Sequence, residues 1–178
     1  MTRRPPRSTR LANRGTALGP GPWRVDGSGS ACVRAALGSV RVSSPSLPWE
    51  CVVIGVPASV QGSPRAKNRW KAAVADAARD AWQVGAIPLT GPVSLTLTYF
   101  HDGAPLDADN MIKPTQDALI GITFVDDGQV KDVHASLRDL NGRYEVRSLR
   151  PALAQGFISG QPFVHIRIED VPDLGVLP

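Results

Sequence analysis

The chain has 178 residues, with 20 Lys and Arg against 16 Asp and Glu and a net charge of +4. This length allows one domain with a buried core and excludes two domains of ordinary size. Residues 1–48 hold eight Arg and a single acid and so carry +7, whereas the remainder carries −3, so the overall charge alone does not indicate nucleic-acid binding.

The first 47 residues are rich in Pro, Gly, Ser and Arg and show no sustained hydrophobic period. So little apolar surface cannot offset the entropy lost on ordering, and the composition therefore predicts a disordered tail. A translation start placed too far upstream is an alternative explanation. If the protein acts on DNA, the tail either adds nonspecific affinity for it or is an inert extension. We expect the folded domain to span residues 48–170 and residues 171–178 to form a flexible end.

Neither a membrane segment nor an exported protein is predicted. No apolar run approaches the roughly 20 residues of a membrane-spanning helix, and no apolar stretch follows the charged start as in a secretory signal. Cys32 and Cys51 are the only cysteines, and they show no pairing or C-x-x-C pattern. Free thiols in a reducing compartment are the expected state. These features predict a cytoplasmic location and no membrane partner.

The first half of the predicted domain reads as strand, loop, helix and strand. Residues 49–56 form a short β-branched run, which is typical of a strand. A turn-rich loop follows, and residues 68–84 then repeat apolar side chains at spacings of three and four, which predicts a helix ended by Gly85. Residues 92–100 alternate apolar and polar side chains, as a strand with one buried face does.

The second half begins with a helix from about Met111 to Ile120, capped by Asp109 or Asn110 and ended by Gly121. Residues 130–137 predict a further strand. A turn at residues 141–142 and a strand near 144–146 predict a hairpin, and residues 163–169 predict a closing strand. This order predicts an α+β domain in which two main helices cover a small mixed β-sheet.

Four acids lie on either side of the second predicted helix, with two lysines among them. Clustered carboxylates repel one another unless a cation or a shared proton compensates them. Oxygen ligands without His or Cys suit a hard ion, so the pattern predicts Mg²⁺, with Mn²⁺ able to substitute. Such an ion can activate water for phosphodiester cleavage, and a nearby lysine can neutralise the scissile phosphate. The residues are Asp107, Asp109, Asp126 and Asp127, with Lys113 and Lys131.

A purely structural explanation of these acids is also open. Asp109 would cap the helix, Asp107 would be an ordinary loop acid, and the D-D-G-Q segment would be a solvated turn, because caps and turns use the same residue types. The EF-hand pattern fails, since no Gly or closing Glu stands at the required offsets after Asp107.

The loop before the first predicted helix, together with the start of that helix, is rich in basic residues. Cations at a helix N-terminus oppose the helix dipole, which favours a functional role over a merely solvated face. If the substrate is DNA, such a patch would bind its phosphates, and neutral side chains beside it would add hydrogen bonds. The predicted DNA contacts are Gln61, Ser63, Arg65, Lys67, Arg69 and Lys71.

The segments DADNMIKPTQDAL and VDDGQVK resemble the RusA family of Holliday junction resolvases, also called crossover junction endodeoxyribonucleases. The resemblance implies a small α+β homodimer that uses Mg²⁺ to cut four-way DNA junctions by paired symmetric nicks, in recombination, repair or phage DNA processing. By position in these motifs, Asp107, Asp109, Lys113 and Asp127 are implied as catalytic residues, and Asp126 as a further metal ligand.

Other matched positions remain open between function and structure. Asn110 either serves the reaction or shapes the turn, and Asp117 either serves it or supports the helix. Gln129 and Lys131 are accessory contacts, Lys131 to DNA, or else solvated strand residues. The segment HDGAPL before the acids is less basic than expected for a junction-binding member. A nonenzymatic junction-binding module is the alternative function, and a structural metal protein without a nucleic-acid partner is a third.

Overall fold

The computed structural model describes residues 45–103, 107–147 and 149–172. The predicted tail lies outside these segments up to residue 44, as do Cys32 and residues 173–178 of the predicted flexible end. Two 3₁₀ turns, η1 and η2, interrupt the helices and strands. In chain order the elements are β1 (Trp49–Ile54), α1 (Pro64–Ala81), β2 (Val93–His101), η1 (Ala108–Met111), α2 (Ile112–Leu119), η2 (Asp127–Gln129), β3 (Val130–Asp139), α3 (Pro151–Ser159) and β4 (Phe163–Asp170).

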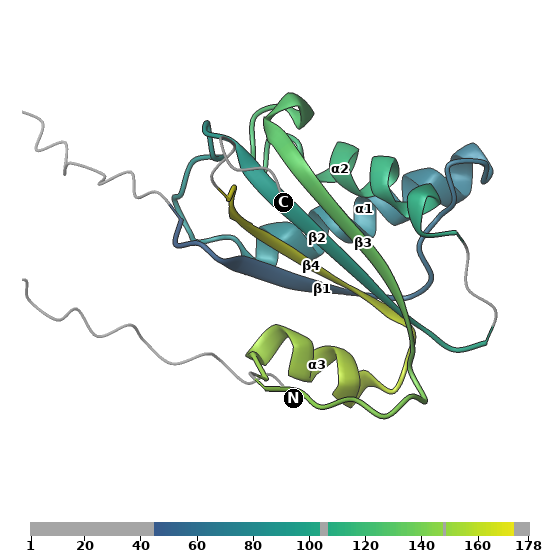
Figure 1. Ribbon diagram of the computed structural model, residues 1–178. Coiled ribbons are helices and arrows are strands. Elements are labelled where there is room, and N and C mark those ends of the chain that lie inside the picture. Colours follow the sequence, from purple (N-terminus) through teal and green to yellow (C-terminus); the bar gives the residue numbers. More distant parts are fainter. Residues whose placement is uncertain (1–44, 104–106, 148, 173–178) are drawn as a thin grey trace, which may run out of the picture. The chain divides into compact units, whose positions relative to one another are not determined.

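The four strands form one mixed sheet in the order β1-β4-β2-β3 (Figure 1). Strand β4 pairs antiparallel with both β1 and β2, whereas β2 and β3 run parallel. Parallel neighbours need a crossover, and the segment containing η1, α2 and η2 supplies it. The predicted α+β fold with a small mixed sheet is confirmed. In the described segments no helix has the length and hydropathy to cross a bilayer.

Helices α1 and α2 cover one face of the sheet. The side chains that alternate on this face of β2 and β4, among them Leu95, Leu97 and Ile166, are fully buried. Trp70, Val74 and Ala78 form the buried stripe of α1. The indole of Trp70 donates to the hydroxyl of Thr115 in α2 (3.1 Å), so a buried hydrogen bond also links the two helices.

Helix α1 begins four residues earlier than the sequence predicts. Ser63 caps it by accepting a hydrogen bond from the Ala66 amide (3.2 Å), and Pro64 stands at the first helical position, which needs no amide hydrogen. The whole basic segment from Arg65 to Lys71 is therefore helical. Its side chains are held at the fixed spacings of a helix rather than on a loop.

The predicted hairpin after β3 is wrong. The neighbour of β3 is the parallel strand β2, and residues 144–146 lie outside every strand. Tyr144 instead packs against Phe100 with ring centroids 5.8 Å apart, and its hydroxyl donates to the Asp139 carbonyl. These contacts fold the segment back as a loop that leads to helix α3.

Helix α3 is absent from the sequence prediction and packs on β1 and β4. Its contact with β4 is close, because a Cβ on Gly156 would lie only 2.5 to 2.7 Å from ring atoms of Phe163. Phe163 also stacks on Phe100 with ring centroids 4.6 Å apart. Since Phe163 alternates with the core residues of β4, this aromatic cluster lies on the face opposite α1 and α2.

Replacing Gly156 with Ala tests this close approach. Gly→Ala inside a helix normally stabilises by about 0.5–1 kcal/mol, but overpacking a filled site costs roughly 1–3 kcal/mol. We therefore expect Gly156→Ala to lower the free energy of unfolding in a urea titration. Gly91→Ala is the matched control, because a Cβ there meets open space. Equal stability of the two variants would contradict the packing described for α3.

Candidate active site

Two of the predicted acids lie on η1, the turn that follows β2. Asp107 precedes the turn and Asp109 lies inside it, and both are exposed. The backbone amide of Val60 donates to the Asn110 carbonyl (3.0 Å), and Met111 is fully buried. The turn is thus anchored to the β1–α1 loop and to the core while its two carboxylates face solvent.

The predicted capping of α2 by Asp109 or Asn110 is wrong. The 3₁₀ turn continues directly into the helix, so both residues already belong to helical structure, and α2 begins at Ile112. The side chain of Asp107 makes no cap hydrogen bond either. Within the described segments neither Asp107 nor Asp109 forms an ion pair. Capping therefore does not explain these carboxylates.

Lys113 in the first turn of α2 lies between two carboxylates. Its ammonium is 2.9 Å from Asp117 Oδ1, one helical turn on, and 2.5 Å from Asp127 Oδ2 in η2. The hydrogen bond to Asp127, followed by that to Asp117, raises the pKa of Lys113 above its ordinary value. The two ion pairs therefore hold the charged lysine at the junction of α2 and η2.

Asp117 is shared by two lysines. Lys71 of α1 reaches its Oδ2 (2.7 Å), while Lys113 takes Oδ1. Burial by itself would raise the pKa of Asp117, but the hydrogen bonds from Lys71 and Lys113 outweigh burial, so the pKa is lowered. The result is an alternating chain of charges, Lys71, Asp117, Lys113 and Asp127, that joins α1, α2 and η2.

Gln129 fixes the shape of η2. Its Oε1 accepts from the amides of Val125 (2.8 Å) and Asp126 (2.9 Å), and its Nε2 donates to the carbonyls of Leu89 (2.9 Å) and Gly91 (2.7 Å). Asp126 completes a capping box by accepting from the Gly128 amide. Sequence reasoning missed this role, although an acid followed by Gln three residues later is the pattern of a capping box.

Gln129→Ala removes all four of these hydrogen bonds. The Val125 amide and the Leu89 carbonyl would keep the hydrogen bond that they make with each other (3.2 Å), but the Asp126 amide and the Gly91 carbonyl would lose Gln129 as their partner. We therefore expect the free energy of unfolding to fall by about 1–3 kcal/mol. The position of Asp127 would also loosen, and cleavage would slow. Urea denaturation and a cleavage assay measure the two effects. The control is Gln155→Ala at an exposed position of α3. A Gln129→Ala protein as stable as this control would contradict the role of Gln129 in fixing η2.

The four predicted metal ligands lie on two separate turns. Asp107 and Asp109 flank the start of η1, whereas Asp126 and Asp127 belong to η2, where one oxygen of each is already engaged. Residues 45–103, 107–147 and 149–172 contain no group of three or more His, Cys, Asp or Glu placed to hold a metal ion. The oxygen donors of Asp107 and Asp109 suit a hard divalent ion. The full set of four stays a prediction.

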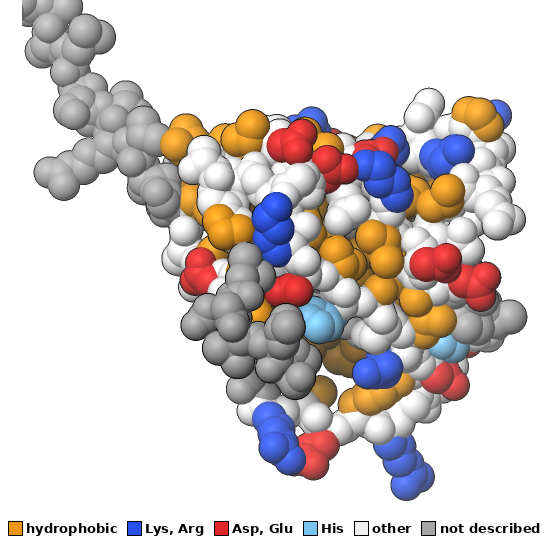
Figure 2. All heavy atoms as spheres, turned by 45° about the horizontal axis from the view of Figure 1, so that its top comes forward, with side chains coloured by type: hydrophobic (Ala, Val, Ile, Leu, Met, Phe, Trp, Pro, Cys, Tyr) orange, Lys and Arg blue, Asp and Glu red, His pale blue; other side chains and the backbone are white. Residues whose placement is uncertain are grey.

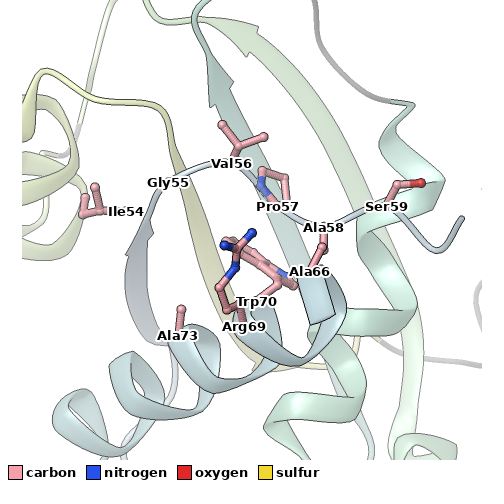
Figure 3. A pocket seen from close by; sticks show the side chains of 10 residues that line it. All are labelled: Ile54, Gly55, Val56, Pro57, Ala58, Ser59, Ala66, Arg69, Trp70 and Ala73. Carbon is pink, nitrogen blue, oxygen red and sulfur yellow. The ribbon is translucent and has the colours of Figure 1, made fainter. Parts of the chain in front are cut away.

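The predicted basic patch divides between two sides of α1. Lys67 and Lys71 line a groove of about 260 Å³ that Lys113 and Asp117 also line. Arg69 lines a different hollow of about 590 Å³, beside the loop that follows β1 (Figure 3). Arg65 and Gln61 are exposed, while the Ser63 hydroxyl is used as the helix cap. Only Lys67 and Lys71 thus share a groove with Lys113.

Lys131, the remaining predicted DNA contact, is exposed at the start of β3. Its ammonium donates to the Gly128 carbonyl of η2 (2.7 Å), close to Asp127 in the chain. Figure 2 shows acidic and basic side chains interspersed over one face of the molecule. Charge for binding an anion is therefore focused locally rather than spread over a broad basic field.

An anchored turn presents exposed carboxylates, and a charged lysine and a lysine-lined groove follow it in the fold. This combination suits phosphodiester cleavage of the nuclease type. The chain belongs to the RusA endodeoxyribonuclease family, whose family model matches residues 59–169. The predicted resemblance is confirmed, and with it the assignment as a Holliday junction resolvase. The match covers every predicted site residue. A search of curated proteins gives no match to this chain.

Proposed function

We propose that this resolvase is a homodimer that cuts four-way DNA junctions by paired symmetric nicks in a Mg²⁺-dependent reaction. Mn²⁺ would substitute for Mg²⁺, and the reaction would serve recombination, repair or phage DNA processing in the cytoplasm. The observation that carries the proposal is the placement of Lys113. It lines the same groove as Lys67 and Lys71 and is held there by Asp117 and Asp127, just after the turn that presents Asp107 and Asp109.

Asp107 and Asp109 would hold the metal ion, with Asp126 and Asp127 completing the predicted ligand set. When bound, a divalent ion supplies an activated water and stabilises the leaving oxygen. Asp127 pairs with Lys113, so this carboxylate would position the lysine beside the reacting phosphate. Lys113 would neutralise charge on that phosphate.

DNA would enter along the groove between α1 and α2. Lys67 and Lys71 line this groove and would contact backbone phosphates, which supply affinity without sequence preference. Lys67 donates to the Val60 carbonyl (3.2 Å), so it lies against the β1–α1 loop that anchors η1. Contacts along the groove would in this way bring the phosphate backbone toward Asp107 and Asp109. Arg65, Arg69, Gln61, Ser63 and Lys131 remain proposed DNA contacts outside this groove.

The test compares a labelled four-way junction with a linear duplex of the same sequence, each incubated with Mg²⁺ or with a chelator. We expect cleavage of the junction alone, with paired nicks in strands of like polarity, and complete loss of cleavage with chelator. Cleavage of both substrates at equal rates would contradict selectivity for branched DNA. Tight junction binding without nicking at any Mg²⁺ or Mn²⁺ concentration would instead favour a nonenzymatic binding module.

A further inference from the structure

Strand β3 forms one edge of the sheet. The strand order is β1-β4-β2-β3, so in the described segments β3 has a neighbour only on the side of β2 (Figure 1). It is ten residues long, and Val133 in its middle is 38% exposed. A long edge strand with unpaired backbone groups is a template for pairing with another strand, and proteins usually cover it or protect it. The side chains of β3 should therefore indicate what covers this edge.

The charges of β3 are self-complementary. When two copies of the strand pair antiparallel about a twofold axis at Ala135, each charged residue of one copy faces a residue of opposite sign in the other. Apolar residues also face apolar residues, and uncharged polar residues face polar residues. The facing pairs are Lys131 with Asp139, Asp132 with Arg138, Val133 with Leu137, and His134 with Ser136. Symmetry repeats each pair, so one interface contains four opposite-charge pairs.

Other symmetric registers lack this match. Facing residues in a sheet point to the same side, so a twofold axis between antiparallel strands must pass through a residue position, and the nearest alternatives are His134 and Ser136. With the axis at His134, Lys131 faces Leu137 and Asp132 faces Ser136. With the axis at Ser136, Arg138 faces His134 and Asp139 faces Val133. Either shift removes every opposite-charge pair.

The charged side chains of β3 are available for such pairing. Within the described part of the chain, none of the four charged residues of β3 forms an ion pair. Lys131 donates to a backbone carbonyl, and Asp139 accepts from the Asn141 amide (2.9 Å) through one oxygen, which leaves its second oxygen for another donor. Among the described residues, Arg138 donates to the carbonyl of Leu137 (2.8 Å) alone.

We propose that two copies of this chain join edge to edge through β3, antiparallel, with the twofold axis at Ala135. The two sheets then continue into one, and the α1 and α2 layers of both copies lie on the same face, because the axis stands normal to the sheet. The inference rests on the proposed function in one respect: it supplies the interface of the homodimer proposed there. It also gives Lys131 a second role, opposite Asp139 of the other copy, beside its proposed contact with DNA.

Cysteine cross-linking tests the register. Facing residues at the axis have Cα atoms about 4.5–5.5 Å apart, within the range that a disulfide spans. In a Cys32→Ser background, in which Cys51 stays buried, we expect Ala135→Cys to form a dimer on mild oxidation. His134→Cys and Ser136→Cys, which would sit on the axis in the shifted registers, should cross-link far less. Equal cross-linking at all three positions, or none at Ala135, would overturn the register.

Charge reversal tests the pairing by sedimentation, without DNA or metal. Asp132→Arg and Arg138→Asp should each weaken dimerisation at least about tenfold, because each places like charges opposite one another twice. The double variant Asp132→Arg with Arg138→Asp should restore the original affinity. A dimer indifferent to both single changes would overturn the interface. If dimerisation follows this pattern but the junction is not cut, the proposed function fails and the interface stands. If the junction is cut by a protein that does not form this dimer, the interface fails and the cleavage activity stands.

Discussion

An Asp109→Asn protein is expected to bind a labelled four-way junction at least as tightly as the original protein and to cut it at least about 100-fold more slowly. Asp109 lies on the exposed side of η1, where capping does not account for its carboxylate. Removing its charge lowers repulsion toward phosphate, so binding should not suffer. The same change removes one of the two carboxylates proposed to hold the metal ion, so the chemical step should slow.

Two measurements separate these effects, namely a gel-shift titration in Ca²⁺ or chelator and a single-turnover cleavage rate in Mg²⁺. Asp80→Asn is the matched control, since Asp80 is an exposed acid on α1, and it should leave both quantities unchanged. Asp109→Asn protein that cuts at the original rate would remove this residue from the site. A parallel loss of binding and of unfolding free energy would show that Asp109 supports the turn instead.

The acidic residues and Lys113 could be singled out from the sequence because their spacing is local. Lys113 and Asp117 are four residues apart on a helix, which places them on one face wherever the helix packs. Asp107 and Asp109 are likewise close in the chain, so they lie on one turn wherever that turn packs. What local spacing could not provide is the partner of Lys113 across the fold, since Asp127 lies at the start of η2, which the chain reaches only after it has turned at Gly121.

The hairpin and helix α3 are mispredicted because of contacts made over long sequence separations. A turn at Asn141 followed by a strand-like segment predicts a hairpin, yet β3 already pairs in parallel with β2, a choice set by the crossover through α2. Helix α3 escaped prediction because Pro151 and Gly156 disfavour a helix interior. Pro151 in fact opens the helix, and Gly156 is required by the ring of Phe163. Gln129 likewise reads as a solvated strand residue until the carbonyls of Leu89 and Gly91 are brought to it.

A Lys113→Gln protein is expected to retain its fold and its affinity for the junction but to lose at least about 100-fold in cleavage rate. The ammonium is the only cation that contacts both Asp117 and Asp127 in the described segments. Glutamine keeps a hydrogen-bond donor of similar length and removes the charge, so the phosphate would meet Asp127 without compensation. The loss should appear in the single-turnover rate at saturating protein.

The control for this change is Arg79→Gln, which removes an exposed cation that pairs with a carboxylate on the same helix, Asp76 (3.1 Å). It should alter neither cleavage nor binding. If Lys113 served only to tie α2 to η2, Lys113→Gln would lower the free energy of unfolding and a stabilising osmolyte would restore cleavage. If Lys113 neutralises the scissile phosphate, the cleavage defect persists in a fully folded protein, because no other part of the alternating charge chain presents a cation to Asp127.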